Sequence, residues 1–458
     1  MDPRKSVLPG LVVALLLATS LTWSGHSLEL TVTATTATLC ILWWVFEPIP
    51  IPATSLLPLA LMPLFGVLTP TETAAAYGSP LILLLLGGFL LSRGMESTGT
   101  HKRVALGVVR LVGSDSPRRL MFGFMAAGAL LSMWISNAAT TLMLVPVALA
   151  VVDSCEQRDK LSAPLLLGLA WACSIGGLGT PIGTPPNLIF MQVYAQVTGE
   201  QISFTRWMSW GIPVVFLMVP IAGWWLSRGL PKTITVTLPE IGQWRSAERR
   251  VLMIFLLTAL AWMTRSEPFG GWRALFNLPN ANDASVAFLA VVLLFMMRDR
   301  DGEKLITWEQ ASRIPWGVLI LFAAGICLAK ASVSSGLSAM AGEALTNLTT
   351  LPVWLMILLV CLAVTFITEA TSNTATTALL MPILAAAAVA AELNPLLLMV
   401  PAAMSASCAF MLPVATAPNA VIFGTERVPI RRMAQEGFAL NIIGAFLITA
   451  LMLLLLPQ

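Results

Sequence analysis

The sequence predicts an all-α integral membrane protein, with about eleven transmembrane helices and two re-entrant hairpins in two inverted repeats. Three observations predict this fold class: the composition, the length of the apolar segments, and a pair of polar motifs that occurs twice. The 458 residues are 57% hydrophobic and 11% charged, whereas about a quarter of the residues of a soluble domain are charged. We therefore expect the lipid bilayer to surround the protein.

Eleven apolar segments are expected to cross the roughly 30 Å of bilayer hydrocarbon. They lie at 8–25, 31–47, 50–66, 80–98, 163–193, 211–227, 251–265, 285–298, 316–334, 397–423 and 436–457. Two further apolar segments, 120–152 and 352–390, are interrupted in their middles by Ser, Asn and Thr. We expect each of these two to be a re-entrant hairpin.

The basic residues predict which loops face the cytoplasm, because Lys and Arg accumulate on that side of a membrane. With the N-terminus inside, most of the 26 Lys and Arg fall in predicted inner loops. The chain is then a multi-pass protein of the cell's inner (plasma) membrane, with its N-terminus cytoplasmic and its C-terminus outside. Two ordinary spans in place of each hairpin would keep the same sides, so the charges alone do not establish re-entrance.

Composition also argues against several other classes of protein. The net charge of +3 gives no electrostatic support for a nucleic-acid partner. Six cysteines are scattered, mostly through apolar segments, with no pair at metal-ligand or redox spacing, and we expect them to be buried. The predicted spans contain no nucleophile, acid/base pair or metal-binding group that would indicate an enzyme.

Two polar motifs occur twice at matched spacing. Residues 136–141 are Ser-Asn-Ala-Ala-Thr-Thr and residues 372–377 are Ser-Asn-Thr-Ala-Thr-Thr, each with a proline ten residues after its serine. The second motif is Gly-Thr-Pro-Pro-Asn at 183–187 and Ala-Thr-Ala-Pro-Asn at 415–419. Matched loops differ in charge, because loop 100–119 has five Lys or Arg and its counterpart has none. The two copies therefore face opposite sides, and the repeat is inverted.

These features divide the chain into four parts. They are an N-terminal helix (1–29), a first inverted repeat (30–230) with hairpin 120–152 and broken helix 163–193, a cytoplasmic linker (231–250), and a second inverted repeat (251–458) with hairpin 352–390 and broken helix 397–423. The broken helices are expected to unwind near Gly183 and Ala415, because proline lacks an N–H and disfavours helical geometry in the residue before it.

Paired broken helices in inverted repeats are typical of secondary transporters, which bind substrate near the bilayer midplane where the repeats meet. Each break exposes carbonyls that suit a cation and a helix N-terminus that suits an anion. Ser, Thr and Asn at the hairpin tips add oxygens for a hard cation such as Na⁺ and donors for a carboxylate. An isolated Ser-Asn-Thr is more often a packing feature of membrane helices, and the duplication at matched spacing favours function. Neither motif contains Lys or Arg, so a bound dianion requires co-bound cations.

At these residues the chain resembles the divalent anion/sodium symporter family, which includes dicarboxylate, tricarboxylate and sulfate carriers. The resemblance rests on both hairpin tips, both Thr-x-Pro-Asn breaks and the stretch Trp43-Trp44…Glu47-Pro48-Ile49-Pro50. It implies a homodimer and an elevator-type transporter with a scaffold region and a mobile transport region. The implied function is sodium-coupled import of dianionic C4-type dicarboxylates such as succinate, fumarate and malate.

The resemblance also implies two sodium sites. The first uses side chains of the first tip and the backbone of the first break, namely Ser132, Ser136, Asn137 and Gly183. The second uses Thr368 and Asn373 together with backbone at Thr371 and Ala415.

For the substrate, the resemblance implies contacts from both tips and the second break, namely Asn137, Asn373, Thr374, Thr416 and the backbone of Ala417. The sequence departs from the family pattern at Ala138, where the first tip usually holds threonine, and at Ala417, where proline is commoner. The missing hydroxyl at Ala138 removes one expected substrate contact.

Several alternatives stay open at this point. A sulfate or tricarboxylate carrier, or a sodium-independent dicarboxylate exchanger, has the same motifs. A channel is disfavoured, because the polar groups gather at two tips and two breaks and not along a pore. Glu369, three residues before Ser372, is either a modulator of a cation site or a structural hydrogen-bond partner. Arg93 and Lys330 are expected to extend to the membrane interface.

Overall fold

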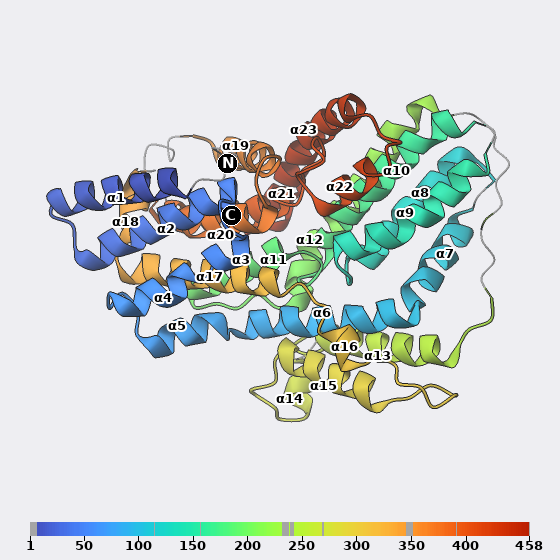
Figure 1. The fold of residues 1–458 in the computed structure, drawn as a ribbon, viewed down its shortest axis with the longest axis horizontal. Coiled ribbons are helices and arrows are strands. Elements are labelled where there is room, and N and C mark those ends of the chain that lie inside the picture. The colour runs from blue at the N-terminus through green and yellow to red at the C-terminus, as the bar shows by residue number, and fades with distance from the viewer. Residues whose placement is uncertain are drawn as a thin grey trace.

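The computed structural model describes residues 7–113, 115–155, 157–230, 238, 242–267, 270–344, 351–390 and 392–457. Apart from one bridge between Arg298 and Lys304, the regular structure of these residues is helical. The helices form an elongated body, with α1 and α2 at one end and α7 to α9 at the other (Figure 1). Much of the predicted linker, namely 231–237 and 239–241, lies outside the described residues.

The first half of the chain contains twelve α-helices in the described residues. They are α1 (Leu8–Trp23), α2 (Leu28–Phe46), α3 (Ile51–Thr54), α4 (Leu57–Leu64), α5 (Pro70–Tyr77), α6 (Pro80–Thr98), α7 (Thr100–Val112), α8 (Pro117–Ser132), α9 (Asn137–Asp153), α10 (Arg158–Gly176), α11 (Pro185–Thr198) and α12 (Phe204–Leu226). Many begin at a capping hydroxyl; at α5, for example, Thr69 and Glu72 form a reciprocal capping box.

The second half continues the helical pattern. Its α-helices are α13 (Ser246–Met263), α14 (Gly271–Leu275), α15 (Asp283–Met296), α16 (Trp308–Ala311), α17 (Trp316–Ser334), α18 (Leu337–Ala344), α19 (Val353–Thr368), α20 (Asn373–Ala390), α21 (Leu396–Ser405), α22 (Ala417–Phe423) and α23 (Ile430–Leu455). The core centres on α10, which is buried along its apolar length.

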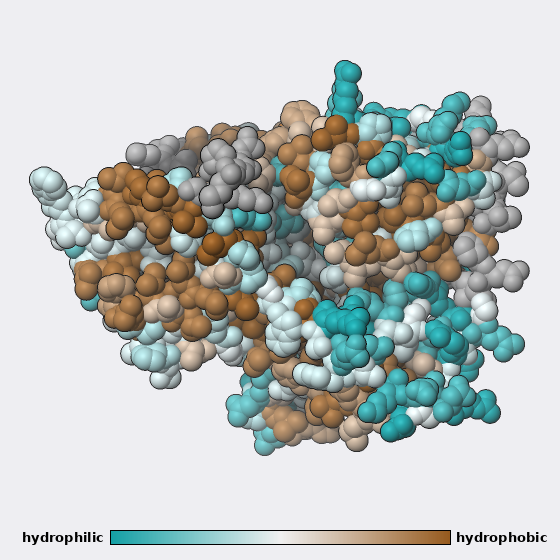
Figure 2. Space-filling model, viewed as in Figure 1, coloured by the Kyte–Doolittle hydropathy of each residue, from teal (hydrophilic) through white to brown (hydrophobic). Residues whose placement is uncertain are grey.

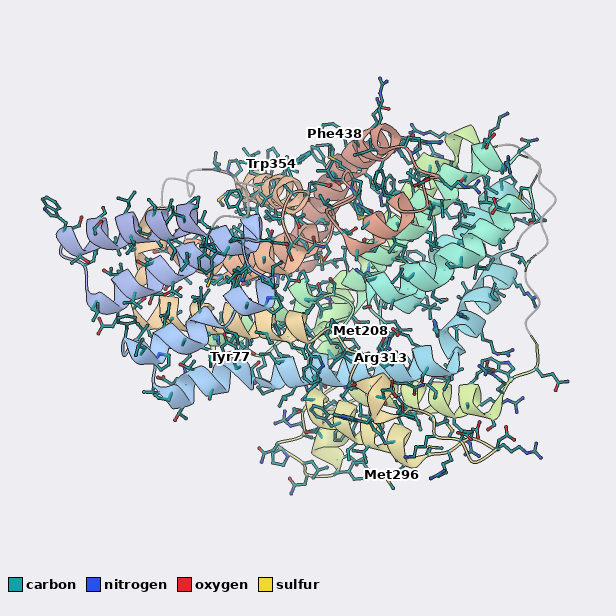
Figure 3. The ribbon with its side chains drawn as sticks, viewed as in Figure 1. Tyr77, Met208, Met296, Arg313, Trp354 and Phe438 are labelled. Atoms are coloured by element: carbon teal, nitrogen blue, oxygen red, sulfur yellow. The ribbon has the colours of Figure 1, made fainter. Side chains whose placement is uncertain are left out.

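Six helical stretches in the described residues are long and apolar enough to cross a membrane: Leu28–Phe46, Pro70–Thr98, Arg158–Gly179, Phe204–Gly229, Trp316–Ser334 and Ile430–Leu455. Large apolar side chains also cover the outside of the molecule. Apolar residues cover α1, α2 and α4 on one face (Figure 2), and the exposed Met296, Trp354 and Phe438 lie at its edges (Figure 3). Other apolar helices are shorter, so the number of eleven crossings stays a prediction.

The span predicted at 50–66 is wrong as a single helix, because the structure has two short helices, α3 and α4. Pro58 lacks the N–H that would bond the carbonyl of Thr54 in a continuous helix. Side chains from neighbouring helices replace the missing donors: the Cys40 thiol lies 3.9 Å from the Thr54 carbonyl, and the Tyr77 hydroxyl donates to the Ser55 carbonyl at 2.5 Å. All six cysteines are buried and free, which confirms that prediction.

A helix, α7, lies where the sequence predicts only an inner loop. Gly99, with a φ of 75°, makes the turn between α6 and α7, which glycine adopts without strain. Arg103 then attaches α7 to the start of α13, because its Nε lies 2.8 Å from a carboxylate oxygen of Glu248 and it also donates to the Gly242 carbonyl at 2.5 Å.

Both predicted hairpins are pairs of helices joined by short tips. Helices α8 and α9 meet at residues 133–136, and α19 and α20 meet at 369–372. The two predicted broken helices are interrupted at 177–184, which includes a 3₁₀ turn (Gly177–Gly179), and at 406–416. Each interruption begins well before the proline motif, and the prolines instead lie in the first turn of α11 and α22, where a missing N–H is tolerated.

The two halves of the chain pack against each other at these breaks. Helix α11 packs against α20 and helix α22 packs against α9, so the segment after each break lies beside the other half's hairpin. The long helices α12 and α23 approach the breaks at Gly211 and Gly437, where a Cβ atom would lie 2.2 Å from the Leu178 carbonyl oxygen and 2.3 Å from the Phe410 carbonyl oxygen. The same contact therefore occurs once in each half.

Candidate functional site

The first hairpin tip holds the side chain of Asn137 in place. The Ser132 hydroxyl, which is fully buried, donates to Asn137 Oδ1 at 2.5 Å. The Ser136 hydroxyl caps α9 by accepting from the Ala139 N–H at 3.2 Å, and Thr141 donates to the Asn137 carbonyl at 2.8 Å. The tip therefore presents an amide oxygen whose position is set by the two ends of the hairpin.

The first break brings a second oxygen to the same place. A Cβ atom at Gly177 would lie 2.8 Å from Asn137 Oδ1 and 3.2 Å from the Gly183 carbonyl oxygen. These two oxygens therefore lie close to one another beside Gly177, together with the Asn137 amide nitrogen, which would lie 3.0 Å from the same Cβ atom. Hard cations prefer oxygen ligands of this kind, so the residues predicted to hold the first sodium ion fit that ion.

The second hairpin tip repeats the arrangement. Thr368 Oγ1 lies 2.7 Å from Asn373 Oδ1 and 3.0 Å from the Ala406 carbonyl oxygen. A hydroxyl has one proton, so it bonds only one of these acceptors at a time and the cluster is rich in oxygen lone pairs. Thr377 donates to the Asn373 carbonyl at 2.7 Å, as Thr141 does in the first tip. Thr371 instead pairs its hydroxyl with that of Thr376 at 2.6 Å.

The side chains of two further asparagines, for which the motifs alone predict no role, bond to the backbone of the breaks. The amide nitrogen of Asn187 donates to the carbonyls of Gly177 and Thr180 at 3.0 and 2.8 Å. In the other half, Asn419 donates to the carbonyls of Ala409 and Leu412 at 3.1 and 3.0 Å. Both side chains are fully buried. Each is the last residue of its proline motif, and this matched position is the one feature of the sequence that indicates a shared role.

Asn419→Asp is expected to destabilise the protein, because a carboxylate cannot donate to the two break carbonyls. Each buried group left without a partner costs about 1–3 kcal/mol. Thermal unfolding in detergent measures the loss, and Asn280→Asp, at an exposed position, is the matched control. Equal unfolding temperatures for the two variants would show that Asn419 does not support the break.

Glu369 is bonded to the backbone of the second break. Its carboxylate is 4% exposed and accepts hydrogen bonds from the N–H groups of Phe410, Met411 and Leu412 at 2.7, 2.9 and 2.9 Å, and from the Asn441 amide at 2.7 Å. Of the two interpretations left open above, the structure shows the hydrogen-bond partner. An effect on a cation site stays a prediction.

The first half holds an uncharged residue at the corresponding place. Met133 lies three residues before Ser136, as Glu369 lies three before Ser372. The backbone carbonyl of Met133 accepts from the Thr180 hydroxyl. The two breaks are therefore supported differently: the buried Glu369 carboxylate bonds the backbone of the second, and a backbone carbonyl bonds the Thr180 side chain of the first.

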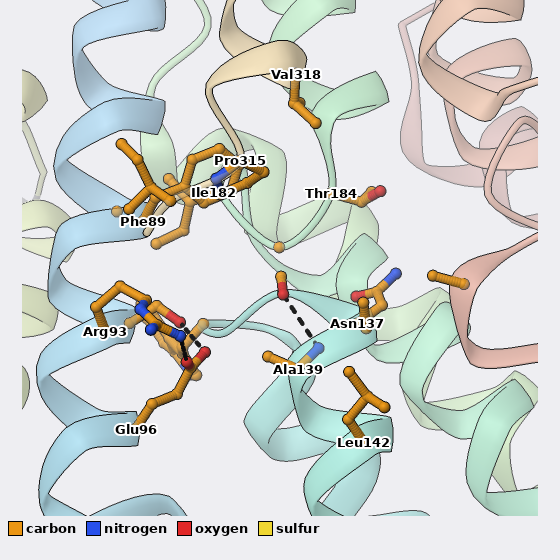
Figure 4. A pocket seen from close by; sticks show the side chains of 18 of the residues that line it. Phe89, Arg93, Glu96, Asn137, Ala139, Leu142, Ile182, Thr184, Pro315 and Val318 are labelled. Carbon is orange, nitrogen blue, oxygen red and sulfur yellow. Dashed lines mark hydrogen bonds and ion pairs between the residues drawn. The ribbon is translucent and has the colours of Figure 1, made fainter. Parts of the chain in front are cut away.

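A cavity of about 780 Å³ reaches the first tip and the first break (Figure 4). Of the predicted site residues, Ser136, Asn137, Ala138, Gly183 and Ala417 line it. The others lie behind its wall or away from it: Ser132, Thr368, Thr371, Asn373, Thr374, Ala415 and Thr416. The two breaks meet where the Ser407 hydroxyl lies 3.5 Å from that of Thr184, which also lines the cavity.

The arrangement combines oxygen-rich clusters with a cavity large enough for a small organic anion. Within the described residues, no group of three or more His, Cys, Asp or Glu could hold a metal ion. Arg93 and Lys330, expected to extend to the interface, form ion pairs with Glu96 and with Glu72, the latter at 3.3 Å.

Comparison with known proteins decides the family. A family model described as the sodium:sulfate symporter transmembrane region matches residues 10–456. The chain belongs to the sodium:sulfate symporter family. This finding confirms the resemblance to divalent anion/sodium symporters, and a multi-pass membrane protein follows from it together with the apolar helices.

Two curated relatives of this sodium:sulfate symporter family member are proteins of Staphylococcus aureus, strains MRSA252 and NCTC 8325. Each is named the sodium-dependent dicarboxylate transporter SdcS and is 40% identical over 439 residues, which cover 91% of this chain and 84% of the relative. The family member is therefore similar to these transporters along nearly its whole length.

Two solved transporter structures share the fold of this family member at low sequence identity. The YdaH transporter of Alcanivorax borkumensis has a TM-score of 0.58 and 16% identity, covering 84% of this chain and 87% of its own. MtrF of Neisseria gonorrhoeae has a TM-score of 0.56 and 14% identity, covering 83% and 82%. At such identities the likeness concerns the fold alone.

Gly177→Ala is expected to impair sodium binding by this family member, because the added methyl group would lie against Asn137 Oδ1 and the Gly183 carbonyl oxygen. The methyl would lie 2.8 Å from Asn137 Oδ1, so that side chain must move. Sodium affinity, measured as the sodium dependence of thermal stability, is expected to fall at least tenfold. Gly107→Ala, whose Cβ would meet nothing within 4 Å, is the matched control, and equal sodium affinities for both variants would contradict this placement.

Proposed function

We propose that this member of the sodium:sulfate symporter family is a sodium-coupled symporter that imports dianionic C4-type dicarboxylates. The observation that carries the proposal is that Asn137 Oδ1 and the Gly183 carbonyl oxygen lie close to one another beside Gly177, at the wall of a cavity of about 780 Å³. A relative 40% identical to this chain and named a sodium-dependent dicarboxylate transporter supports the substrate class and the coupling ion.

The proposed binding site joins both hairpin tips and both breaks. Sodium is bound by the first cluster of Ser132, Ser136, Asn137 and Gly183, and by the second cluster of Thr368, Thr371, Asn373 and Ala415. The dicarboxylate is bound by Asn137, Asn373, Thr374, Thr416 and Ala417, beside Ala138. In this proposal the protein is a homodimer in a cellular membrane, with its N-terminus in the cytoplasm, and an elevator-like movement carries the site across.

Charge balance predicts that at least two sodium ions accompany each dianion. The two tips and the two breaks that form the proposed site contain no Lys or Arg, and uncompensated charge at midplane depth is costly. A third ion would make transport electrogenic and add about 2.3 kcal/mol of driving force per 100 mV. The sodium dependence and voltage dependence of uptake in proteoliposomes measure this number. A Hill coefficient near one with no response to voltage would contradict it.

Ala138→Thr tests how the first tip meets the substrate. Ala138 lines the cavity next to Asn137, and a threonine there would add a donor. A hydrogen bond to a charged group contributes about 1.5–3 kcal/mol, so we expect succinate to bind about tenfold more tightly with unchanged selectivity. If the alanine instead makes room for a larger anion, the variant would bind the native substrate more weakly and succinate more tightly.

Competition experiments separate the C4 dicarboxylates from the rival substrates of this family. Uptake of labelled succinate into proteoliposomes is measured with unlabelled fumarate, malate, sulfate and citrate as competitors. The proposal predicts competition by fumarate and malate at far lower concentrations than by sulfate or citrate. Stronger competition by sulfate or citrate would assign the protein to the sulfate or tricarboxylate carriers.

A further inference from the structure

A cavity of about 330 Å³ lies away from the first hairpin tip, between the first two helices and the second hairpin. It is lined by α1, α2, α17, α18 and α20, which gather at one end of the molecule (Figure 1). None of the described residues that line it is charged, and most are apolar. Its lining segments in α2 and α17, 34–44 and 328–332, lie inside two of the stretches long enough to cross a membrane. We therefore place the cavity at the depth of the bilayer hydrocarbon.

Water finds few hydrogen-bond partners in this cavity. The Trp44 indole N–H already donates to the Ser55 hydroxyl at 3.0 Å, and the Ser332 hydroxyl donates to a backbone carbonyl of its own helix at 2.8 Å. Among the described lining residues, Thr38 and Ser338 are the other two with polar side chains. A buried water usually requires about two to four polar partners. An apolar ligand therefore suits the cavity better than water.

Helix α1 forms one wall of the cavity and is attached to the molecule through α2. In the described residues it packs against α2 and makes no extensive contact with α18 or α20. Leu17 and Leu21 of α1 nevertheless line the cavity together with Ile383 of α20. The neighbouring Leu15 and Leu16 are each 64% exposed, on a helix that apolar residues cover (Figure 2). The cavity thus adjoins a surface that faces lipid, and the molecules beside it are lipid tails.

We propose that this cavity binds an acyl chain of a membrane phospholipid. Lipid tails are as apolar as leucine, so a chain that leaves the bilayer for the cavity gains little from the hydrophobic effect. It gains packing, because side chains around a void lose the dispersion contacts that a filled space provides. The volume lies at the lower end of the roughly 300–1,000 Å³ typical of ligand pockets. It suits one flexible chain and is too small for a partner helix.

An adjoining cavity of about 360 Å³ has a different character. It is lined by α11, α17, α18 and α20, and it meets the acyl-chain cavity at Ser338 and Pro382. Gln196 lines it, and the Oε1 atom of this residue is buried without a hydrogen-bond partner among the described residues. A polar atom of this kind suits water, so the proposal concerns the apolar cavity alone. Helix α20 borders both cavities at Pro382, where proline also removes a helical hydrogen bond.

A bound chain is expected to affect transport through α20. This helix begins at Asn373, in the second tip, and we expect it to shift relative to α2 and α17 in the proposed elevator-like movement. Packed protein interfaces do not deform continuously, whereas an acyl chain changes shape readily and can fill the space in both positions. This consequence rests on the proposed function. The binding of the chain does not.

A phospholipid with a photoreactive diazirine in its acyl chain tests the site in nanodiscs that contain the whole protein. After illumination, mass spectrometry of peptides locates the attached lipid. We expect attachment on α1 around Leu15, which faces bulk lipid, and also on the cavity residues of α20 between Ala378 and Ile383. Ala37→Phe, which places a ring in the cavity, is expected to lower attachment on α20 about fivefold relative to α1, because the ring excludes the chain. Leu289→Phe, at an exposed position outside the lining, is the matched control and is expected to leave the ratio unchanged.

Attachment confined to α1 and other lipid-facing surfaces of the parent would overturn the acyl-chain site, whether or not Ala37→Phe folds. Equal attachment on α20 in the parent and in folded Ala37→Phe would overturn it as well. Loss of this attachment on adding unlabelled free fatty acid, at constant phospholipid, would contradict a phospholipid and identify a fatty acid. Because labelling requires no transport, an absence of sodium-driven succinate uptake would refute the proposed function separately. With uptake intact, Ala37→Phe is expected to lower the maximal rate about threefold and to leave the half-saturating succinate concentration unchanged.

Discussion

Glu369→Ala is expected to abolish sodium-driven transport, and Glu369→Gln to lower sodium affinity at least tenfold. The carboxylate accepts from three consecutive N–H groups of the second break and from Asn441. Alanine leaves these buried donors unpaired, at about 1–3 kcal/mol each. Glutamine keeps one acceptor oxygen but turns an NH₂ group toward a backbone donor. The break also contributes the backbone of Ala406 and Ala415 to the proposed second sodium site. Distortion of the break is therefore expected to lower the affinity for sodium.

The measurement is sodium-dependent thermal stabilisation of each variant, with transport assayed in parallel. Glu248→Gln is the matched control, because Glu248 is an equally buried carboxylate that instead pairs with Arg103 and Arg245. We expect that control to lose stability and keep its sodium affinity. If Glu369→Gln behaved like the control, Glu369 would support folding without affecting the cation site.

Asn137→Ala and Asn373→Ala are each expected to weaken sodium and dicarboxylate binding together. Each amide oxygen lies within hydrogen-bond distance of the Ser132 or Thr368 hydroxyl, in the proposed cation cluster, while the amide nitrogen remains available as a donor to a carboxylate. A hydrogen bond to a charged group contributes about 1.5–3 kcal/mol, which corresponds to roughly tenfold or more in affinity.

Sodium titrations at fixed succinate, and succinate titrations at fixed sodium, separate the two effects. Asn280→Ala, at an exposed position, serves as the control. Unchanged sodium dependence in both tip variants would rule out a site shared between the ion and the substrate. Loss of succinate affinity alone would mean that these side chains contact only the anion.

Much of the candidate site could be predicted from the sequence, because the duplicated motifs are local. The turns at 133–136 and 369–372 lie directly before or at the first residue of each Ser-Asn motif, whose following residues begin α9 and α20, and the proline motifs span the starts of α11 and α22. Proline disfavours helical geometry in the residue before it and is tolerated in the first turn of a helix, and the sequence carries both constraints directly.

Features that depend on contacts between distant segments could not be predicted. The breaks begin at Gly177 and Ala406, well before the prolines, and they are held by Asn187 and Asn419, which bond to carbonyls up to ten residues earlier. Likewise, the break after α3 is stabilised by Cys40 and Tyr77 from other helices. The side of the cavity away from the first tip combines α6, α7 and the segment before α17, a juxtaposition that tertiary packing alone creates.

The most direct test of the proposed function is uptake of labelled succinate by the purified protein in proteoliposomes, with an inward sodium gradient or an equal potassium gradient. We predict saturable accumulation above the external concentration with sodium, and uptake at the level of protein-free vesicles with potassium. Equal, gradient-independent uptake under both conditions, accelerated only by preloaded dicarboxylate, would contradict sodium symport and identify an exchanger.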